Sequence, residues 1–369
     1  MFVKKFLLFC ILNFAPPNAD FVLYSSLYAQ HTVSSFAGTD SGYVNGKLSE
    51  AKFNTAFGIC IDKEGNIYAA DSGNNCIRKI DADGIVSTFA GTGQTGNDDG
   101  TANAATFNSP TGICSDDMGN FYVADFMNHT IRKIDNEGNV TTLAGSAGNP
   151  GFADGYANQA QFNYPRGIAV DNEGNLFVGD SWNHRIRKIT PDGNVTTYAG
   201  GGNQIGVDSK GSWVDGPDTT ARFFTPCGAA VDNFGNVYVA DALNHRIRKI
   251  DTFGNVTTIA GNGNSGWNNG SFADGANSSA ILNTPTELFV TPDQEIIFSD
   301  TFGNRVRIIN IDGTVSTIAG NGTAGFHDGE SSNAMFNYPR GIAMDAAEDK
   351  IFVIDSKNFR IRLITKKED

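Results

Sequence analysis

Short runs of β-branched and aromatic residues, separated by turn-forming residues, recur along most of this chain. In the clearest stretch these runs cover residues 167–170, 176–179, 186–189 and 195–199. The sequences DNEG (171–174) and TPDG (190–193) connect the first run to the second and the third to the fourth, and their Asp and Gly residues are typical of tight hairpins. The pattern therefore predicts four antiparallel strands in this stretch. No apolar spacing of three and four residues persists long enough to predict a helical repeat.

This four-strand unit is repeated six times. Its central Asp180 recurs at intervals of 54 to 61 residues, and an Arg follows each copy by seven positions. The other copies of the pair are Asp71 and Arg78, Asp125 and Arg132, Asp241 and Arg248, Asp300 and Arg307, and Asp355 and Arg362, with Arg187 following Asp180. With 43 glycines in 369 residues, the pattern predicts an all-β fold, a six-bladed β-propeller of four-stranded antiparallel blades.

The two ends of the repeat region complement each other. Residues 33–38 (VSSFAG) match the fourth strand of a unit, whereas the last unit stops after its third strand, at residues 360–365. We therefore expect the N-terminal strand to complete the last blade. Such a closure hides both sheet edges, which would otherwise favour aggregation.

The segment after each central Asp resembles the signature of NHL repeats. It reads DSWNHRIRKI at 180–189 and DALNHRIRKI at 241–250, and the resemblance extends over nearly all of residues 33–365. The resemblance implies a propeller of a kind that serves as a protein-binding platform, as an RNA-binding domain or, in one related branch, as a zinc-dependent lyase. That branch carries zinc-binding His residues around the channel mouth, and none of the corresponding positions here is His. A shared fold does not choose among these functions.

The first residues have the pattern of an export signal. Lys4 and Lys5 precede an apolar run at 6–14, and Ala29 offers a small residue at a cleavage site. We therefore expect residues 1–29 to be a signal peptide, residues 30–369 to form a single propeller domain, and the protein to be periplasmic, displayed at the cell surface or secreted.

The composition limits the kinds of partner that the protein is expected to bind. Lys and Arg number 27 and Asp and Glu 40, so the net charge is −13, which argues against binding nucleic acid. Outside the N-terminal segment no apolar run is long enough to span a membrane. We expect a monomer without a cofactor, and small buried roles for Cys60, Cys76, Cys114 and Cys227.

Residues present in every blade are predicted to be structural. The Asp and Arg of each unit are expected to form a buried ion pair. His129, His184 and His245 occupy equivalent turns, where a zinc site is the alternative to a turn-stabilising role. The Phe or Leu of each long inter-blade loop is expected to plug the space between blades.

Positions at which one blade departs from the others are better candidates for binding. The residue between Pro and Gly should edge the central channel, and Arg166 and Arg340 stand there in opposite blades. Glu287 replaces a Gly found in the other copies. Together with Thr111 and Thr286, these residues predict a channel mouth that holds a small anion or a peptide terminus.

The long inter-blade loops predict which face binds a ligand. Loops of this length are often functional, and Trp182, Trp213 and Trp267 are the predicted aromatic anchors. The sequence favours an exported, non-enzymatic scaffold that binds a protein, peptide or glycan on this face, with no catalytic residue and no metal ligand predicted. The alternative is a metal-assisted hydrolase or lyase with its site at the channel mouth.

Overall fold

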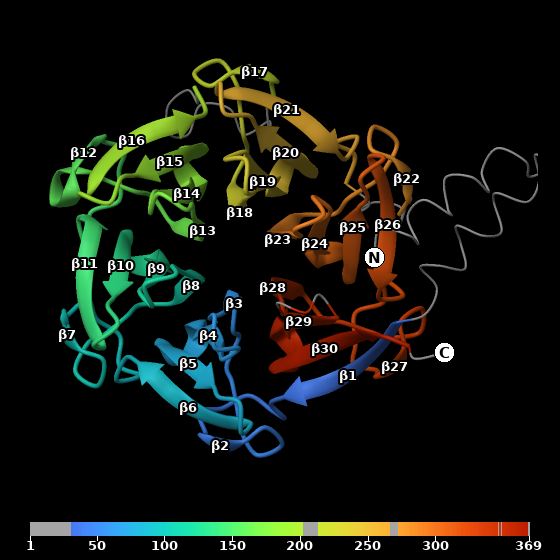
Figure 1. Ribbon diagram of the computed structural model, residues 1–369, viewed down its shortest axis with the longest axis horizontal. Coiled ribbons are helices and arrows are strands. Elements are labelled where there is room, and N and C mark those ends of the chain that lie inside the picture. The colour runs from blue at the N-terminus through green and yellow to red at the C-terminus, as the bar shows by residue number, and fades with distance from the viewer. Residues whose placement is uncertain (1–30, 202–212, 266–271, 346, 348, 368–369) are drawn as a thin grey trace, which may run out of the picture.

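The computed structural model describes residues 31–201, 213–265, 272–345, 347 and 349–367, which form a ring of six antiparallel sheets (Figure 1). The innermost strands surround the axis and are β3 (Ile59–Ile61), β8 (Pro110–Ser115), β13 (Pro165–Val170), β18 (Pro226–Val231), β23 (Pro285–Val290) and β28 (Pro339–Met344). The second strands are β4 (Ile67–Asp71), β9 (Phe121–Asp125), β14 (Leu176–Asp180), β19 (Val237–Asp241), β24 (Ile296–Asp300) and β29 (Lys350–Asp355). The fold class, an all-β six-bladed propeller, is therefore confirmed.

The outer half of each blade begins after a one-turn 3₁₀ helix. These helices are η1 (Ser72–Asn74), η2 (Phe126–Asn128), η4 (Ser181–Asn183), η5 (Ala242–Asn244), η7 (Thr301–Gly303) and η8 (Ser356–Asn358), while η3 (Ala157–Gln159) lies in a long loop. The third strands are β5 (Cys76–Ile80), β10 (Thr130–Ile134), β15 (Arg185–Ile189), β20 (Arg246–Ile250), β25 (Arg305–Ile309) and β30 (Arg360–Lys366). The fourth strands are β6 (Ile85–Ala90), β11 (Asn139–Gly145), β16 (Asn194–Ala199), β21 (Asn255–Ala260) and β26 (Thr314–Ala319).

The fourth strand of the last blade is β1 (His31–Ala37), which pairs with β30 from His31–Lys366 to Ala37–Ile361. In Figure 1 this blue strand lies beside the red one. The predicted closure by the N-terminal strand is therefore confirmed. Val33 is 2% exposed and packs against the apolar cluster between the last two blades, so the closure is also part of the core.

Each blade has five strands, not the predicted four. The fifth is a two-residue strand in the long loop, paired with the fourth strand: β2 (Gly46–Lys47), β7 (Gly100–Thr101), β12 (Gly155–Tyr156), β17 (Gly216–Pro217), β22 (Gly275–Ala276) and β27 (Gly329–Glu330). Its Gly has a φ between +124° and +149°, which favours glycine. Such a strand carries no hydrophobic alternation, so the sequence pattern could not reveal it.

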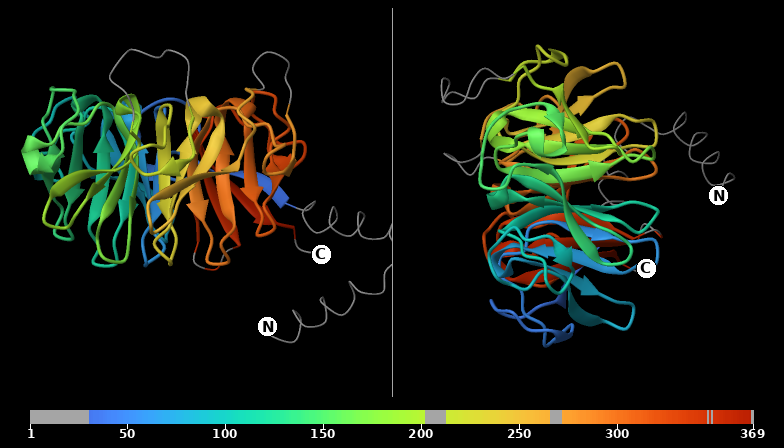
Figure 2. Two further views of the ribbon diagram at one scale, coloured as in Figure 1. Left: turned by 90° about the horizontal axis from the view of Figure 1, so that it is seen from above. Right: turned by 90° about the vertical axis from the view of Figure 1, so that its left-hand side faces the viewer.

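A buried Arg anchors the long loop of each blade to its sheet. Arg187 donates to Asp180 Oδ2 at 2.8 Å and to Asp154 Oδ1 of the loop at 2.6 Å, and its other bonds go to the backbone oxygens of Gln161 and Ala153. Phe162 is buried below this guanidinium, whose carbon lies 5.1 Å from the ring centroid. The predicted ion pairs and loop plugs are thus present, and they order the loops of a disc seen edge-on in Figure 2.

Candidate functional site

Six equivalent residues stand at, or just before, the start of the inner strands around the central channel. They are Phe57, Thr111, Arg166, Cys227, Thr286 and Arg340. Five of these strands are irregular at this point; in β13 the register with β14 shifts between Pro165 and Ile168. Bulges of this kind re-aim side chains. The inner strands therefore present a ring of non-identical side chains at one end of the channel.

In five blades the residue after Arg166 or its equivalent is glycine, because neighbouring inner strands lie too close together for a larger residue. A Cβ on Gly167 would lie 2.4 Å from Gly228 Cα. In the fifth blade Glu287 replaces the glycine, and its Oε2 would lie 2.6 Å from a Cβ placed on Gly228. The side chain of Glu287 therefore uses the space that the glycine of the fourth blade leaves free.

Arg166 and Arg340 are positioned by aromatic rings. Their guanidinium carbons lie 5.8 and 4.1 Å from the centroid of the same ring, Phe57, and Arg166 also lies 5.1 Å from the ring of Phe126. Arg166 Nη1 is 3.7 Å from Cys227 Sγ. The Arg340 side chain makes no hydrogen bond or ion pair within the described part of the chain, and its Nε is buried without a partner.

The carboxyl of Glu287 has no hydrogen-bond partner either, in the part of the chain that the structure describes, and its Oε1 is buried. Burial raises the pKa of Glu287 to about 8, although the charges of Arg166 and Arg340 oppose the rise. Burial, together with the charge of Arg166, lowers the pKa of Arg340 to about 10. The two guanidiniums therefore lie near a buried carboxyl whose pKa is raised, so positive charge is in surplus here, in a protein that is acidic overall.

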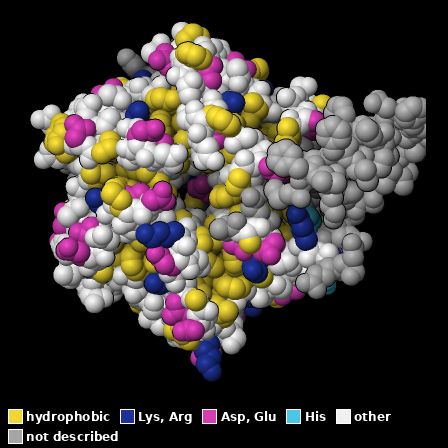
Figure 3. Space-filling view, in the orientation of Figure 1, with side chains coloured by type: hydrophobic (Ala, Val, Ile, Leu, Met, Phe, Trp, Pro, Cys, Tyr) yellow, Lys and Arg dark blue, Asp and Glu magenta, His cyan; other side chains and the backbone are white. Residues whose placement is uncertain are grey.

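The two arginines line a cavity of about 550 Å³ at the channel mouth. Its other walls include Trp182, His184, Phe224, Leu243 and Phe302, contributed by the third to fifth blades. This cavity opens on the long-loop face, which points away from the viewer in Figures 1 and 3. The space-filling view shows the opposite face, which is hollowed at its centre and has Asp and Glu side chains spread over it (Figure 3). We call the cavity of about 550 Å³ the channel-mouth cavity.

The structure brings together part of the predicted site. Arg166, Arg340, Thr286 and Trp182 line the channel-mouth cavity, and Glu287 lies close enough for both arginines to act on its charge. Thr111 is buried, and its hydroxyl donates to the backbone oxygen of Arg166 at 3.1 Å. It therefore joins two blades instead of facing the cavity.

The three predicted aromatic anchors do not form one group. Trp182 is 53% exposed, and its ring lies 4.6 Å from that of Tyr164. Trp213 is stacked on Arg246 at 3.8 Å, as Phe152, Phe272 and Phe326 are stacked on the equivalent Arg of their blades. Trp213 thus belongs to a repeated loop contact, and Trp267 lies outside the described residues.

The wall residues Leu243 and Phe302 were not predicted from the sequence, although a signal for them existed. Like the predicted Trp182, each is the second residue after the central Asp of its blade, and this position varies from blade to blade. Phe57 stands at the variable position of the inner strand. Variation at a position that faces the axis was thus the useful signal, but the sequence could not show which of these side chains share a cavity.

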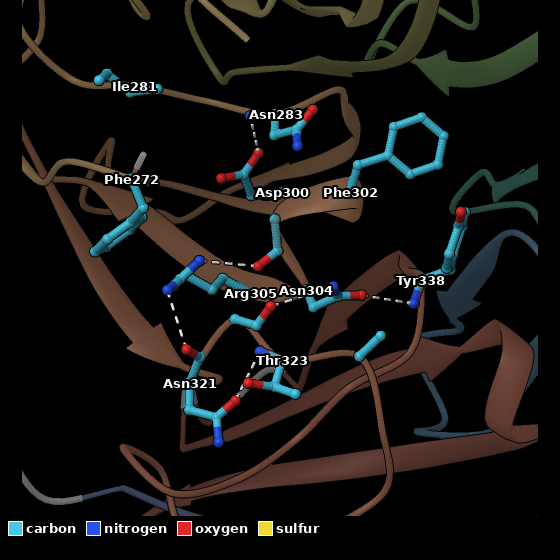
Figure 4. A pocket seen from close by; sticks show the side chains of 13 residues that line it. Phe272, Ile281, Asn283, Asp300, Phe302, Asn304, Arg305, Asn321, Thr323 and Tyr338 are labelled. Atoms are coloured by element: carbon cyan, nitrogen blue, oxygen red, sulfur yellow. Dashed lines mark hydrogen bonds between the residues drawn. The ribbon is translucent and has the colours of Figure 1, made fainter. Parts of the chain in front are cut away.

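A second cavity, of about 500 Å³, lies between the fifth blade and the loop of the sixth and shares Phe302 with the first (Figure 4). Arg305 spans it, donating to the backbone oxygens of Gly303 at 3.0 Å and Asn321 at 3.1 Å. Asn304 Oδ1 accepts the backbone N–H of Tyr338 at 3.2 Å. These polar groups are engaged within the protein, so this cavity has less unused bonding capacity than the channel mouth.

The three equivalent histidines stabilise turns. His129, His184 and His245 each have a φ near +57°, and Nδ1 of each accepts a backbone N–H of the next blade at 3.1 Å. Burial lowers the pKa of all three, which favours the neutral ring that this hydrogen bond requires. Within the described residues no group of three or more His, Cys, Asp or Glu has a geometry that could hold a metal ion.

A family model described as "NHL repeat" matches residues 53–80, 107–134, 162–189 and 336–362. The chain is an NHL-repeat protein. Each matched segment runs from the plug residue of a long loop to the third strand of the same blade, so the match covers the inner half of four blades.

Curated relatives of this NHL-repeat protein are longer than it is. It is 30% identical to NHL repeat-containing protein 2 of Bos taurus over an alignment of 310 residues that covers 75% of this chain and 42% of that protein. It is also 30% identical to Protein SUPPRESSOR OF QUENCHING 1, chloroplastic, of Arabidopsis thaliana, over 61% of this chain and 22% of that protein. The chain thus spans less than half the length of these relatives.

Solved structures share the fold of this NHL-repeat protein at low sequence identity. An auxiliary nutrient binding protein from Bacteroides ovatus superposes with a TM-score of 0.67 and 19% identity, covering 92% of this chain and 78% of that one. A catalytically inactive virginiamycin B lyase from Staphylococcus aureus, solved with quinupristin, gives a TM-score of 0.55 and 12% identity over 92% and 100% of the two chains. These likenesses concern the fold alone.

No described helix is long and apolar enough to cross a membrane.

Proposed function

We propose that this NHL-repeat protein is an exported, non-enzymatic scaffold that binds a protein, peptide or glycan ligand at the channel-mouth cavity on its long-loop face. Arg340 carries the proposal, because its guanidinium lines the cavity and makes no hydrogen bond within the described residues. In the same blade, the guanidinium of Arg362 is bonded to two carboxylates and two backbone oxygens. A guanidinium left with free donors beside a cavity is suited to a ligand that supplies the acceptors.

The walls of the cavity support the same proposal. Binding sites are concave, mostly apolar and furnished with a few polar groups, and this cavity combines Trp182, Leu243 and Phe302 with the two arginines. The name of the Bacteroides ovatus neighbour adds support for a binding role on this fold. Export, and the assignment of residues 30–369 as the mature domain, rest on the pattern of residues 1–29.

A ligand screen tests the proposal. The purified protein is screened by thermal shift against peptides, oligosaccharides and small metabolites, and ligands that raise the melting temperature are measured by calorimetry. We expect Arg340→Gln to weaken binding by tenfold or more. Arg360→Gln, at the start of β30 in the same blade and stacked on Phe326 of the long loop, should leave binding unchanged. Ligands that bind both variants equally would place the site elsewhere, and a screen without any ligand would contradict the proposal.

A further inference from the structure

Neither channel-mouth arginine forms an ion pair with a carboxylate in the described part of the chain. The guanidinium carbons of Arg166 and Arg340 lie 5.8 and 4.1 Å from the centroid of the Phe57 ring and line one cavity, so two like charges lie close together. Stacking occupies the face of a guanidinium and leaves its in-plane N–H groups at the edge. An anion between the two edges would relieve the repulsion and use these donors.

We propose that the channel-mouth cavity binds the carboxylate of an organic acid between Arg166 and Arg340, with the apolar body of the ligand against Trp182, Leu243 and Phe302. This inference rests on the proposed function and names the ligand class of the same site. Within the described part of the chain, the carboxyl of Glu287 forms no ion pair with either arginine.

The number of free donors favours a carboxylate over an inorganic anion. A carboxylate has two oxygens, and each can face one guanidinium. Among the other polar lining residues, Thr286 has its hydroxyl already bonded to Thr301 Oγ1 at 2.5 Å and to Ser299 Oγ at 3.2 Å. The further oxygens of phosphate or sulfate would therefore gain no donor from Thr286, and placing them against Trp182, Leu243 and Phe302 would be costly.

The apolar wall favours an acid with a hydrocarbon body. Trp182 and Leu243 project from neighbouring blades and are 53% and 41% exposed, so each has surface to bury against a ligand. Burial of apolar surface contributes about 25 cal/mol per Å². A free aliphatic or aromatic acid and the C-terminus of a peptide ending in an apolar residue share this chemistry.

Calorimetry with matched probes tests the inference. The probes are 4-phenylbutyrate, its amide, an Ala-Ala-Leu peptide with a free or amidated C-terminus, inorganic phosphate and sulfate. We expect at least one acid to bind, its amide to bind at least about tenfold more weakly, and phosphate and sulfate to bind more weakly than the acid. The acid that binds identifies the source of the carboxylate, a small molecule or a peptide terminus.

Two variants assign the binding to the arginines. Arg340→Gln should reduce the affinity for the acid to that for the amide, and Arg340→Lys should restore it partly, since an ammonium keeps the charge but lacks the planar fork. Comparison of acid and amide on the unaltered protein keeps the test valid if a variant does not fold. Arg360→Gln serves as the matched control.

The outcomes separate this inference from the proposed function. Equal affinity for acid and amide, preference for phosphate or sulfate, or a ligand found in the screen that lacks a carboxylate yet depends on Trp182, would overturn the carboxylate inference and leave the scaffold standing. Absence of binding by every probe, together with an empty screen, would overturn both.

Discussion

Arginine serves two purposes in this propeller, and its surroundings decide between them. The six Arg that follow the central Asp are fully buried and donate to carboxylates and backbone oxygens on both sides. Arg166 and Arg340 are only stacked on rings, with a single contact from Arg166 to a sulfur. Repetition predicts the first kind from the sequence. The second kind is visible only when the acceptors around each guanidinium are known.

The ionisation of Glu287 should make the protein less stable as the pH rises. Its pKa is raised to about 8 in the folded state, against an ordinary value of 4.5. The folded state therefore binds the proton more tightly than the unfolded chain, and this contribution to stability is complete below pH 4.5 and is lost as the pH rises through about 8. Arg340, with a pKa of about 10, stays charged over this range. Burial raises the pKa of the Cys114 and Cys227 thiols, so these thiols stay neutral.

Thermal unfolding of the Glu287→Gln variant between pH 5 and 9 measures this effect. We expect the melting temperature of the unaltered protein to fall relative to that of the variant over this range, because glutamine remains neutral. Glu137→Gln, on an exposed hairpin, is the control and should follow the unaltered protein. Parallel curves for the protein and its Glu287→Gln variant would show that Glu287 titrates normally.

The two described tryptophans should respond differently to substitution. Trp182→Ala is expected to weaken binding of a ligand found in the screen by about tenfold or more, because the ring is exposed in the wall of the channel-mouth cavity. Trp213→Ala should instead lower the unfolding free energy by about 1 kcal/mol through loss of the stack on Arg246, with the affinity unchanged. Calorimetry and urea unfolding of both variants separate the two roles, and a loss of affinity in Trp213→Ala would contradict this division.

At the scale of the element, the long loop and the sheet form one unit through a shared arginine. The sequence predicted the Phe or Leu that plugs the space between blades, and it predicted the ion pair within the sheet. It could not show that the loop Asp binds the same Arg, because that contact joins Asp154 to Arg187 across 33 residues. A contact of this separation leaves no local pattern.

The two carboxylates bound to Arg187 should differ in their importance. Asp180 is fully buried and accepts bonds from Asn163 N, Asn183 Nδ2 and Arg187, whereas the side chain of Asp154 is 45% exposed. We expect Asp180→Asn to cost about 3–5 kcal/mol, because it leaves a buried guanidinium without its carboxylate. Asp154→Asn should cost about 1 kcal/mol or less. Urea unfolding checks the order, and equal losses would show that the loop contact is as important as the buried one.

At the scale of the whole molecule, the number of blades and the closure could be predicted because they follow from counting repeats. The site could be predicted only in part. Arg166 and Arg340 were found because they break the repeat in opposite blades, and Trp182 because it is an unusual residue on the expected face. The sequence could not show that Phe57 contacts both arginines, because this contact depends on the curvature of the propeller. The curvature brings residues of the first, third and sixth blades together.

The junction between the last and first blades lacks a contact that the other five possess. Asn75, His129, His184, His245 and Asn304 each accept a backbone N–H of the following blade. The sixth blade has Phe359 at this place, with a φ of +55°, and the side chain of Phe offers no acceptor to the N–H of Thr55. The junction between the sixth and first blades is therefore the one junction, among the described residues, without this hydrogen bond between blades. The pairing of β1 with β30 lies within the sixth blade.

Phe359→Asn should therefore stabilise the ring. Asn tolerates the left-handed conformation better than Phe, and its Oδ1 would gain the N–H of Thr55 as a donor, as Asn75 Oδ1 already has that of Ser109 at 2.9 Å. We expect the unfolding free energy to rise by about 1 kcal/mol, measured by urea unfolding. His184→Asn, which exchanges one acceptor for another, should be nearly neutral, and His184→Ala should be destabilising by about the same amount. If Phe359→Asn lowered the stability, the packing of the Phe ring would outweigh the missing hydrogen bond. The junction between the sixth and first blades would then depend on apolar contacts.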